Sequence, residues 1–464
     1  MVILYSKKDM KLMEDSIDNI ISDAMRVTLT KLEPTLDEYN KVMEIILKYI
    51  RTNKRVIYGG YGWNELIIKK NPDDRIYSKD MIERPDIEFY SSDPIIDLVN
   101  LCNELHGKEF KGVRGESAQH EETYPLFVNQ QQYCDISYMP KFLMDKMSTK
   151  KINDLLISHP KFILIDIMRQ YNDPMTSYWR IKKNLLRANL LLSHYPLETK
   201  GKFIKQKIND STQRTLDFVR KEIIIGSKLL VFGYYGYQYY IYKANDDNKE
   251  ELYVPYYDVI STNLSEDARS AYEKLIAFNE NITVEEYHPF FQFVDKRISF
   301  LHNNKIILNI YGSNDKCIPS YHIPKKDIYI VTFPYMIQTL LIKQLYHSLN
   351  KNNDEASTLD FLLGNIINER NVYLKNHNKT ILDNTPFREF RIECQGETMA
   401  PDRKFRLSIA EKIKKRQRIK FRYDPSARND NFKPEIYKFS NSSGNKNNTQ
   451  DKILINSSGN KILK

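Results

Sequence analysis

Cysteine is scarce in this sequence, and its spacing excludes several classes of protein. The 464 residues contain four cysteines, Cys102, Cys134, Cys317 and Cys394. They form no Cys-x-x-Cys pair, and their spacing matches neither a zinc site nor the dense disulfide framework of a small secreted domain. We therefore expect four reduced, mostly buried thiols in an intracellular protein.

Long hydrophobic runs and clustered histidines are also missing. No apolar run approaches the roughly 20 residues that a membrane-spanning helix needs. Charged residues begin at Lys7 and Lys8, so the apolar stretch before them is too short for a secretory signal peptide. The nine histidines have no partners that predict a zinc site or a catalytic triad. These absences predict a soluble protein that works without a membrane.

The composition that remains is that of a large globular chain with excess positive charge. Hydrophobic residues make up 41% and charged residues 28%, and the length predicts two or three domains. Seventy Lys and Arg against sixty Asp and Glu give a net charge of +10, which favours a polyanionic partner. The 32 tyrosines suit base stacking, although core packing is the better explanation for most of them.

A strand, a two-glycine turn and a helix are predicted over residues 56–67. The apolar residues 56–58 form the strand, and Gly59 and Gly60 form a turn whose backbone N–H groups can approach a phosphate. Asn64 lies one turn into the helix and is a further candidate for nucleotide binding, with helix capping or surface exposure as an equal alternative. A Gly-Gly pair by itself is usually only a turn.

Three carboxylates follow the two-glycine turn, and their order along the chain is typical of a functional site. Asp86 and Glu88 stand at i and i+2 of a predicted strand, so both project from one face. Asp135 lies inside a later predicted strand, 132–139. Acid pairs at this spacing also arise by chance, and a solvated strand face is the competing interpretation. The order of strand, Gly-Gly, helix, acid pair and third acid is what favours a site.

Nucleotidyl transfer is the chemistry that fits this set. The reaction needs two divalent ions, one to activate the attacking 3′ hydroxyl and one to neutralise the triphosphate. Hard ions such as Mg²⁺ prefer carboxylate oxygen, which acids on adjacent strands supply. The sequence therefore predicts catalytic and metal-binding roles for Asp86, Glu88 and Asp135.

Two predicted helices after Pro160, at 161–171 and 177–192, carry a cluster of basic residues. The candidates for contact with triphosphate or RNA are Arg169, Arg180, Lys182 and Lys183. A solvated helix face is the favoured alternative for each of them.

The second half of the chain repeats the first. The offset is 174 residues between Gly59 and Gly233, 172 between Asp86 and Asp258, and 174 between the prolines 160 and 334. Three landmarks that share one offset indicate a duplicated α/β unit. This alignment sets Asp258 opposite Asp86, which leaves Ile260 in the place of Glu88.

The repeat has lost its acids and so predicts a degenerate copy. Tyr234 replaces the second glycine, and Asn309 or a neighbour falls where Asp135 would be. A repeat unit that keeps its strands but loses its carboxylates is expected to retain its packing role and to have lost catalytic activity.

The predicted fold class is mixed α and β with four parts. These are an N-terminal helical region (1–54), a catalytic domain with trailing helices (55–200), a degenerate copy (201–424) and a tail (425–464). The tail is rich in Asn, Ser and Lys and is predicted to be disordered. The basic run 412–422 could track RNA, but such runs are usually solvated.

The pattern of Gly-Gly, Asp-x-Glu and a third acid on a later strand resembles the polymerase-β-like nucleotidyltransferase superfamily. The whole layout over residues 1–424 looks like the poly(A) polymerase catalytic subunits of large cytoplasmic DNA viruses, most closely the mimivirus-like group and more distantly the poxvirus enzyme. That resemblance implies a Gly59–Gly60 nucleotide turn and a metal triad of Asp86, Glu88 and Asp135. It also implies a homodimer without an obligatory processivity subunit, acting in the cytoplasmic viral factory and possibly packaged in the virion.

The prediction is template-independent addition of AMP from ATP to the 3′ end of RNA or an oligo(A) primer, with Mg²⁺ or Mn²⁺. One alternative is a uridylyltransferase or another terminal transferase of different base choice. A second is a non-catalytic RNA-binding scaffold, against which the full acid set argues. A basic DNA-binding protein is the third and least favoured alternative, because no recognition helix with base-contacting side chains stands out in the sequence.

Overall fold

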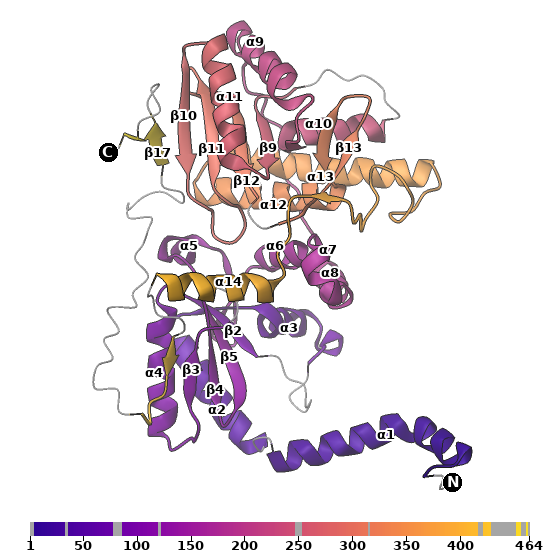
Figure 1. Cartoon of the computed structure of the whole chain (residues 1–464), viewed down its shortest axis with the longest axis vertical. Coiled ribbons are helices and arrows are strands. Elements are labelled where there is room, and N and C mark those ends of the chain that lie inside the picture. The colour runs from indigo at the N-terminus through magenta and orange to yellow at the C-terminus, as the bar shows by residue number, and fades with distance from the viewer. Residues whose placement is uncertain are drawn as a thin grey trace.

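The chain folds into two α/β bodies, which lie one above the other in Figure 1. The computed structural model describes residues 4–32, 36–77, 86–118, 122–245, 253–313, 316–415, 421–427, 452–455 and 461–462. These residues form two mixed sheets, one of eight strands and one of ten, and helices cover them. The predicted fold class, two tandem α/β units behind a helical N-terminus, is confirmed.

The lower body contains the first sheet, in the order β16-β3-β4-β5-β2-β1-β7-β6. Its strands are β1 (Val56–Tyr58), β2 (Ile87–Ser91), β3 (Arg114–Glu116), β4 (Thr123–Val128), β5 (Gln131–Tyr138), β6 (Thr149–Ile152), β7 (Leu155–Ser158) and β16 (Arg422–Tyr423). Its helices are α3 (Gly59–Lys70), α4 (Pro94–Gly107), α5 (Lys141–Lys146), α6 (Pro160–Tyr171), α7 (Pro174–Ser177) and α8 (Ile181–His194). β2 is central, antiparallel to β1 and parallel to β5. Ile57, Phe89 and Ile136 are fully buried, so these short apolar runs form the middle of the sheet.

The upper body repeats this plan with ten strands. Its helices are α9 (Asp210–Phe218), α10 (Gly233–Ala244), α11 (Leu264–Phe278), α12 (Phe333–Leu349) and α13 (Asn353–Asn376). Its strands are β8 (Leu230–Phe232), β9 (Tyr257–Ser261), β10 (Ile282–Tyr287), β11 (Arg297–His302), β12 (Lys305–Gly312), β13 (Ile318–Ile323), β14 (Ile328–Val331), β15 (Cys394–Gln395), β17 (Lys452–Ile455) and β18 (Lys461–Ile462). β9 is antiparallel to β8 and parallel to β12, as β2 is to β1 and β5.

Strand register corrects one detail of the predicted repeat. Tyr58, the residue before the first turn, pairs with Glu88, whereas Phe232, before the second turn, pairs with Asp258. Asp258 is therefore the counterpart of Glu88, not of Asp86. By the same register Tyr256 takes the place of Asp86, and Ile260 does not take the place of Glu88. The spacing between turn and strand differs between the halves, so one fixed offset misaligned the acids.

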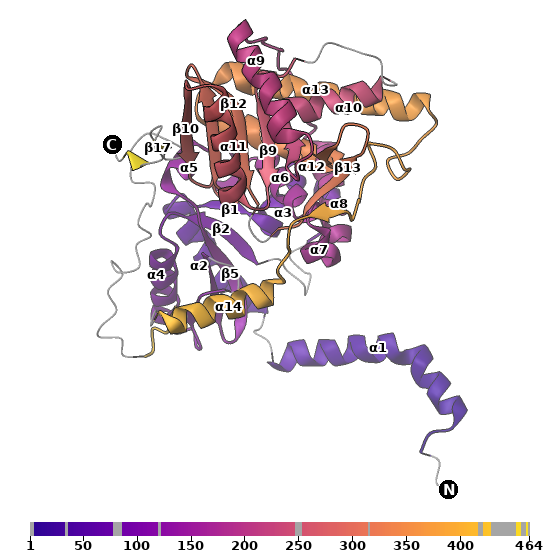
Figure 2. The ribbon, with the colours of Figure 1, turned by 45° about the horizontal axis from the view of Figure 1, so that its top comes forward.

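Two helices precede the first sheet, as predicted. α1 (Lys7–Leu32) leads away from the lower body in both ribbon views (Figures 1 and 2). α2 (Leu36–Thr52) packs on α4 and β7 through an apolar face that includes Ile46 and Ile50, both fully buried. Arg55, just after α2, pairs with the buried Asp97 of α4 at 2.6 Å. No described helix has the length and apolar character needed to span a membrane.

The two bodies are joined mainly through α6, which packs on α12. The Asn172 amide donates to Gln338 at 2.8 Å, and both side chains are buried. The Tyr171 hydroxyl donates to Glu389 at 3.1 Å, and Lys161 lies 3.7 Å from Asp360. Helix α6 therefore belongs to the lower body but is held in place by the upper one.

Cysteine pairing contradicts the prediction of four free thiols. A disulfide joins Cys317 to Cys394, with their Cα atoms 5.3 Å apart, while Cys102 and Cys134 are free and buried. The cause is the antiparallel pairing of β13 with β15, which brings together two residues 77 apart in sequence. Spacing along the chain could not reveal that contact.

The chain crosses back to the lower body after β15. Helix α14 (Pro401–Lys414) lies over the lower body in both views (Figures 1 and 2), and β16 then pairs with β3 at the edge of the first sheet. Much of the basic run 412–422 and most of the predicted tail lie outside the described residues. Within the tail, β17 pairs with β10 at the edge of the second sheet, and β18 pairs with β17.

Candidate active site

A cavity of about 410 Å³ lies where the first sheet meets helices α6 and α8. Its sheet side is formed by the turn after β1 and by acids of β2, β5 and the residue before β2. Its opposite wall is formed by side chains of α6 and α8, and Trp63 of α3 and Tyr77 also contribute. The cavity brings together both predicted glycines and all three predicted acids.

The glycine turn is shaped around Glu88. Gly59 has φ of +64°, a left-handed conformation that favours glycine, and a Cβ at this position would collide with the Glu88 carboxylate. The Gly60 N–H donates to Glu88 Oε2 at 2.8 Å. The turn therefore presents backbone N–H groups at the start of α3, directly beside an acid.

Strand register places the carboxylates side by side. Glu88 and Asp135 are partners on the parallel strands β2 and β5. Asp86 lies two residues before Glu88, so it shares the same face. Asp86 accepts a hydrogen bond from Gln132 at 3.0 Å.

Burial and mutual repulsion make these acids hard to ionise together. Burial, and then the charges of Glu88 and Asp86, raise the pKa of Asp135 to about 7. Burial also raises the pKa of Glu88, a shift that the Gly60 N–H opposes and the charge of Asp166 reinforces. Burial raises the pKa of Asp86, which nearby Lys183 partly offsets. Such a site gains stability when a cation enters it.

The carboxylates do not form a finished metal cage. Among the described residues, no three His, Cys, Asp or Glu side chains are gathered closely enough to hold an ion. The reason is visible in their partners, since Glu88 is turned toward Gly60 and Asp86 toward Gln132. The donors that the cavity offers are carboxylate oxygens, which is the donor type that Mg²⁺ and Mn²⁺ prefer.

The other predicted site residues divide into two groups. Arg180, the residue before α8, and Lys183 of α8 line the cavity. Lys182 is exposed and does not line it, and Arg169 is turned to Asp166 at 3.2 Å. Helical geometry explains the exclusion of Lys182, because only residues three or four apart share a face, as Lys183 and Arg187 do.

Asn64 supports the segment that carries Tyr77. It is buried, its side-chain oxygen accepts from the N–H groups of Ile76 and Tyr77, and its amide donates to the Tyr77 carbonyl. These bonds hold the segment that carries Tyr77 into the cavity wall. Asn64 is not among the residues that line the cavity, and nucleotide binding by its side chain stays a prediction.

Several residues of the cavity wall were not singled out from the sequence. On α6 these are Ile163, Asp166, Ile167 and Gln170, and on α8 they are Asn184 and Arg187. They recur at helical spacing on two predicted helices, which is the signal that could have found them. The Arg187 side chain donates to the Tyr77 hydroxyl at 3.1 Å, while its buried Nε has no partner within the described chain.

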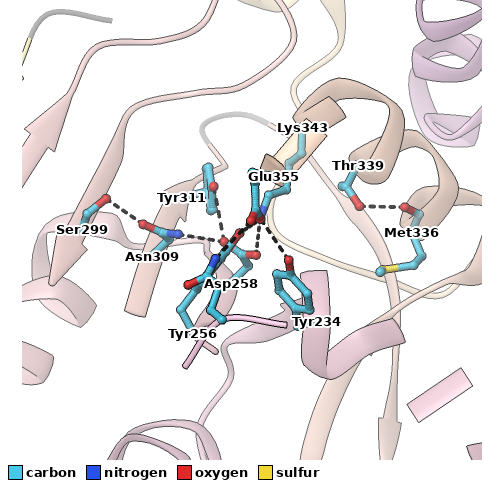
Figure 3. A network of polar contacts seen from close by, with 11 residues as sticks. Tyr234, Tyr256, Asp258, Ser299, Asn309, Tyr311, Met336, Thr339, Lys343 and Glu355 are labelled. Atoms are coloured by element: carbon cyan, nitrogen blue, oxygen red, sulfur yellow. Dashed lines mark hydrogen bonds and ion pairs between the residues drawn. The ribbon is translucent and has the colours of Figure 1, made fainter. Parts of the chain in front are cut away.

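The second body shows what became of the same site in the repeat (Figure 3). Asp258, the counterpart of Glu88, is fully buried, and the Lys343 ammonium donates to it at 2.5 Å and to the Tyr256 hydroxyl at 3.2 Å. The Asn309 amide donates to Asp258 at 2.9 Å, from the position that corresponds to Asp135. Tyr234 and Tyr256 both donate to Glu355.

This network closes the second site. An internal ammonium occupies the place beside the acid, and the adjoining cavity measures only about 60 Å³. Burial opposes the charge of Lys343, but Asp258, Tyr311 and Glu355 raise its pKa above the usual value. The second body therefore carries a cation of its own and has no room for a nucleotide.

In the first body a two-glycine turn faces three carboxylates, and the second body repeats the sheet without the full set. This arrangement places the chain among the nucleotidyltransferases. The family model for poly(A) polymerase catalytic subunits matches residues 44–177. The model for the C-terminal part of the mimivirus poly(A) polymerase catalytic subunit matches residues 189–457. The two matches correspond to the two bodies of the structure.

Individual relatives agree with these matches. The chain is 33% identical over 488 residues to the poly(A) polymerase catalytic subunit of Acanthamoeba polyphaga mimivirus, covering 95% of this chain and 83% of that protein. The crystal structure of the Megavirus polyadenylate synthase aligns with a TM-score of 0.85 and 32% identity, over 100% of this chain and 94% of that one. An African swine fever virus poly(A) polymerase catalytic subunit is 28% identical over 178 residues, 37% of each chain. The chain belongs to the poly(A) polymerase catalytic subunit family and is an enzyme of that class, which takes ATP and RNA and requires a divalent metal.

Proposed function

We propose that the chain transfers AMP from ATP to the 3′ hydroxyl of RNA in the cavity between the first sheet and helices α6 and α8. The observation that carries this proposal is the convergence of Asp86, Glu88 and Asp135 on the Gly59–Gly60 turn in one cavity. The 3′ oxygen attacks the α-phosphorus of ATP, the bond to the β-phosphate breaks, and pyrophosphate leaves. The polypeptide supplies position and charge.

Asp86, Glu88 and Asp135 are the residues that would hold the divalent cations. Three carboxylates are the hard oxygen donors that Mg²⁺ and Mn²⁺ prefer, and a bound cation would offset the burial and the charges of Glu88 and Asp86 that raise the pKa of Asp135 to about 7. The ammonium beside Asp258 in the second body supports a cation at the equivalent place here. When bound, such ions activate the attacking hydroxyl and neutralise charge on the triphosphate.

Three basic residues are suited to the triphosphate. Lys183 and Arg187 lie one helical turn apart on the face of α8 that lines the cavity, and Arg180 lines it from the N-cap position just before this helix. The unpartnered Nε of Arg187 is a buried donor that a phosphate oxygen would satisfy. Gly60, at the opposite wall, adds the positive end of a helix.

Base choice separates this proposal from a uridylyltransferase. We expect an oligo(A) primer supplied with each nucleoside triphosphate singly, with Mg²⁺ or Mn²⁺, to be extended at least tenfold faster with ATP than with any other. Gel analysis of primer length measures this directly. Faster extension with UTP would instead establish the alternative activity on the same site.

The pH dependence of stability tests the charge in the cavity. Because the folded-state pKa of Asp135 is about 7 and the ordinary value is 3.8, its ionisation costs folding energy as pH rises. Metal-free protein should therefore lose stability between about pH 4 and pH 7, and Asp135→Asn should remove part of that loss and raise the melting temperature at pH 8. Thermal denaturation with and without Mn²⁺ measures both. A Tm of Asp135→Asn below that of the wild type at pH 8 would contradict the assignment.

We also propose that the chain works as a homodimer without an obligatory separate processivity subunit. Helix α1 supports this, since it projects from the body and exposes Ile17, Ile20, Ile21 and Met25 at helical spacing (Figure 2). Light scattering on the purified protein gives the state directly.

A further inference from the structure

The two bodies carry a basic residue at the same place in the helix that follows the last repeated strand. Arg169 stands nine residues after Pro160, which lies at the start of α6. Lys343 likewise stands nine residues after Pro334, at the start of α12. In the second body this side chain reaches the acid, because the Lys343 ammonium contacts Asp258 at 2.5 Å. An equally placed arginine is long enough to do the same in the first body.

Arg169 bonds Asp166 and a residue of the upper body instead, and it does not line the cavity. Its guanidinium bonds Asp166 at 3.2 Å, one turn earlier on α6, and Gln292 of the upper body at 3.4 Å. It also lies 5.7 Å from the ring centroid of Phe293. Asp166 and Arg169 are each about one quarter exposed, so this ion pair is partly shielded from water.

The residue that holds Arg169 is missing in the second body. The position that corresponds to Asp166 is Leu340, which is fully buried and has no charge to offer Lys343. Where the aspartate is present, the cation is turned aside and the acids face an open cavity. Where leucine replaces it, the cation fills the site.

We propose that Asp166 is a positioning residue that holds Arg169 out of the carboxylate cavity and so keeps the cation site open for a divalent metal. This inference rests on the proposed function, in which Asp86, Glu88 and Asp135 bind that metal. Without Asp166, Arg169 would be free to turn to the three carboxylates of the adjoining cavity, as Lys343 turns to Asp258 in the second body. A guanidinium bonds carboxylates in a bidentate manner, so it would compete with metal for their oxygens.

Four proteins test the proposal: wild type, Asp166→Leu, Arg169→Met and the double variant. Mn²⁺ affinity is measured by isothermal titration calorimetry on full-length protein, and primer extension is measured over a range of Mn²⁺ concentrations. We expect Asp166→Leu to weaken Mn²⁺ binding at least tenfold and to regain most of its rate at high Mn²⁺. Arg169→Met should bind Mn²⁺ as the wild type does. The double variant should bind within about threefold of the wild type.

The rescue by Arg169→Met is the decisive result, because a general structural role or a metal-ligand role of Asp166 would not be reversed by removing an arginine. Failure of the double variant to recover Mn²⁺ affinity would overturn the proposal. If Asp166→Leu does not fold, Asp166→Asn, which keeps the shape and loses the charge, takes its place with the same expected rescue. Asp135→Asn is the reference for the proposed function. If it binds Mn²⁺ as tightly as the wild type, the proposed metal site fails, and the inference about Asp166 is overturned with it.

Discussion

Asp86→Asn, Glu88→Gln and Asp135→Asn are each expected to slow primer extension about a thousandfold or more. Each change keeps the size of the side chain and removes one charged oxygen donor from the cavity. A loss of about 4 kcal/mol of transition-state stabilisation, which is typical when metal-assisted charge stabilisation fails, corresponds to a factor near 10³. Single-turnover extension of an oligo(A) primer with ATP and Mn²⁺ measures the loss.

A matched control separates charge in the cavity from charge elsewhere. Asp154→Asn removes an exposed carboxylate in the turn between β6 and β7 of the same body, outside the cavity. We expect its rate to stay within about twofold of the wild type. Circular dichroism and thermal denaturation verify that all four variants fold. Near wild-type extension by Asp135→Asn or Glu88→Gln would show that the reaction does not depend on this site.

Lys343→Met is expected to destabilise the protein by about 3–5 kcal/mol, the largest effect on folding that the structure predicts. Lys343 and Asp258 form an ion pair with almost no exposure to water. Removing one partner leaves the Asp258 carboxylate buried with an uncompensated charge, which costs several kcal/mol. The Asn309 amide and the Tyr311 hydroxyl would remain as its donors. Urea denaturation followed by tryptophan fluorescence and circular dichroism measures the change.

The double variant Asp258→Asn/Lys343→Met identifies the cause. It removes both charges, so it should regain at least half of the stability that Lys343→Met loses. Lys151→Met, which removes a lysine from an exposed ion pair, should change stability by less than about 1 kcal/mol. Equal stabilities of Lys343→Met and the wild type would mean that the pair in Figure 3 does not stabilise the second body.

Much of the lower body, which carries the candidate active site, could be predicted from the sequence because the sequence patterns that define it are local. Gly59 and Gly60 sit between an apolar strand and a helix, and Asp86 and Glu88 alternate on one strand face. Such features depend on residues a few positions apart, where backbone geometry alone decides which side chains share a face. The duplication was also visible, since each copy keeps the same order of turn, strand and helix.

The errors fall where distant segments meet. The sequence offset set Asp258 opposite Asp86, but strand register sets it opposite Glu88, because the loop between turn and strand differs in length. Cys317 and Cys394 form a bond only because β13 and β15 pair. Arg169 was chosen with Arg180 as a candidate for contact with triphosphate or RNA; in the structure its guanidinium bonds Asp166, and only Arg180 lines the cavity.

The sequence by itself determined the chemistry of this protein: a glycine turn and three acids in a fixed order, present in one half and dismantled in the other. Only the tertiary structure decided which side chains share the cavity. It brought α6 and α8 over the acids and placed an ammonium beside the buried Asp258. The physical reason is range, since strand and helix periodicity act between neighbours in the chain, whereas packing and charge pairing act between neighbours in space.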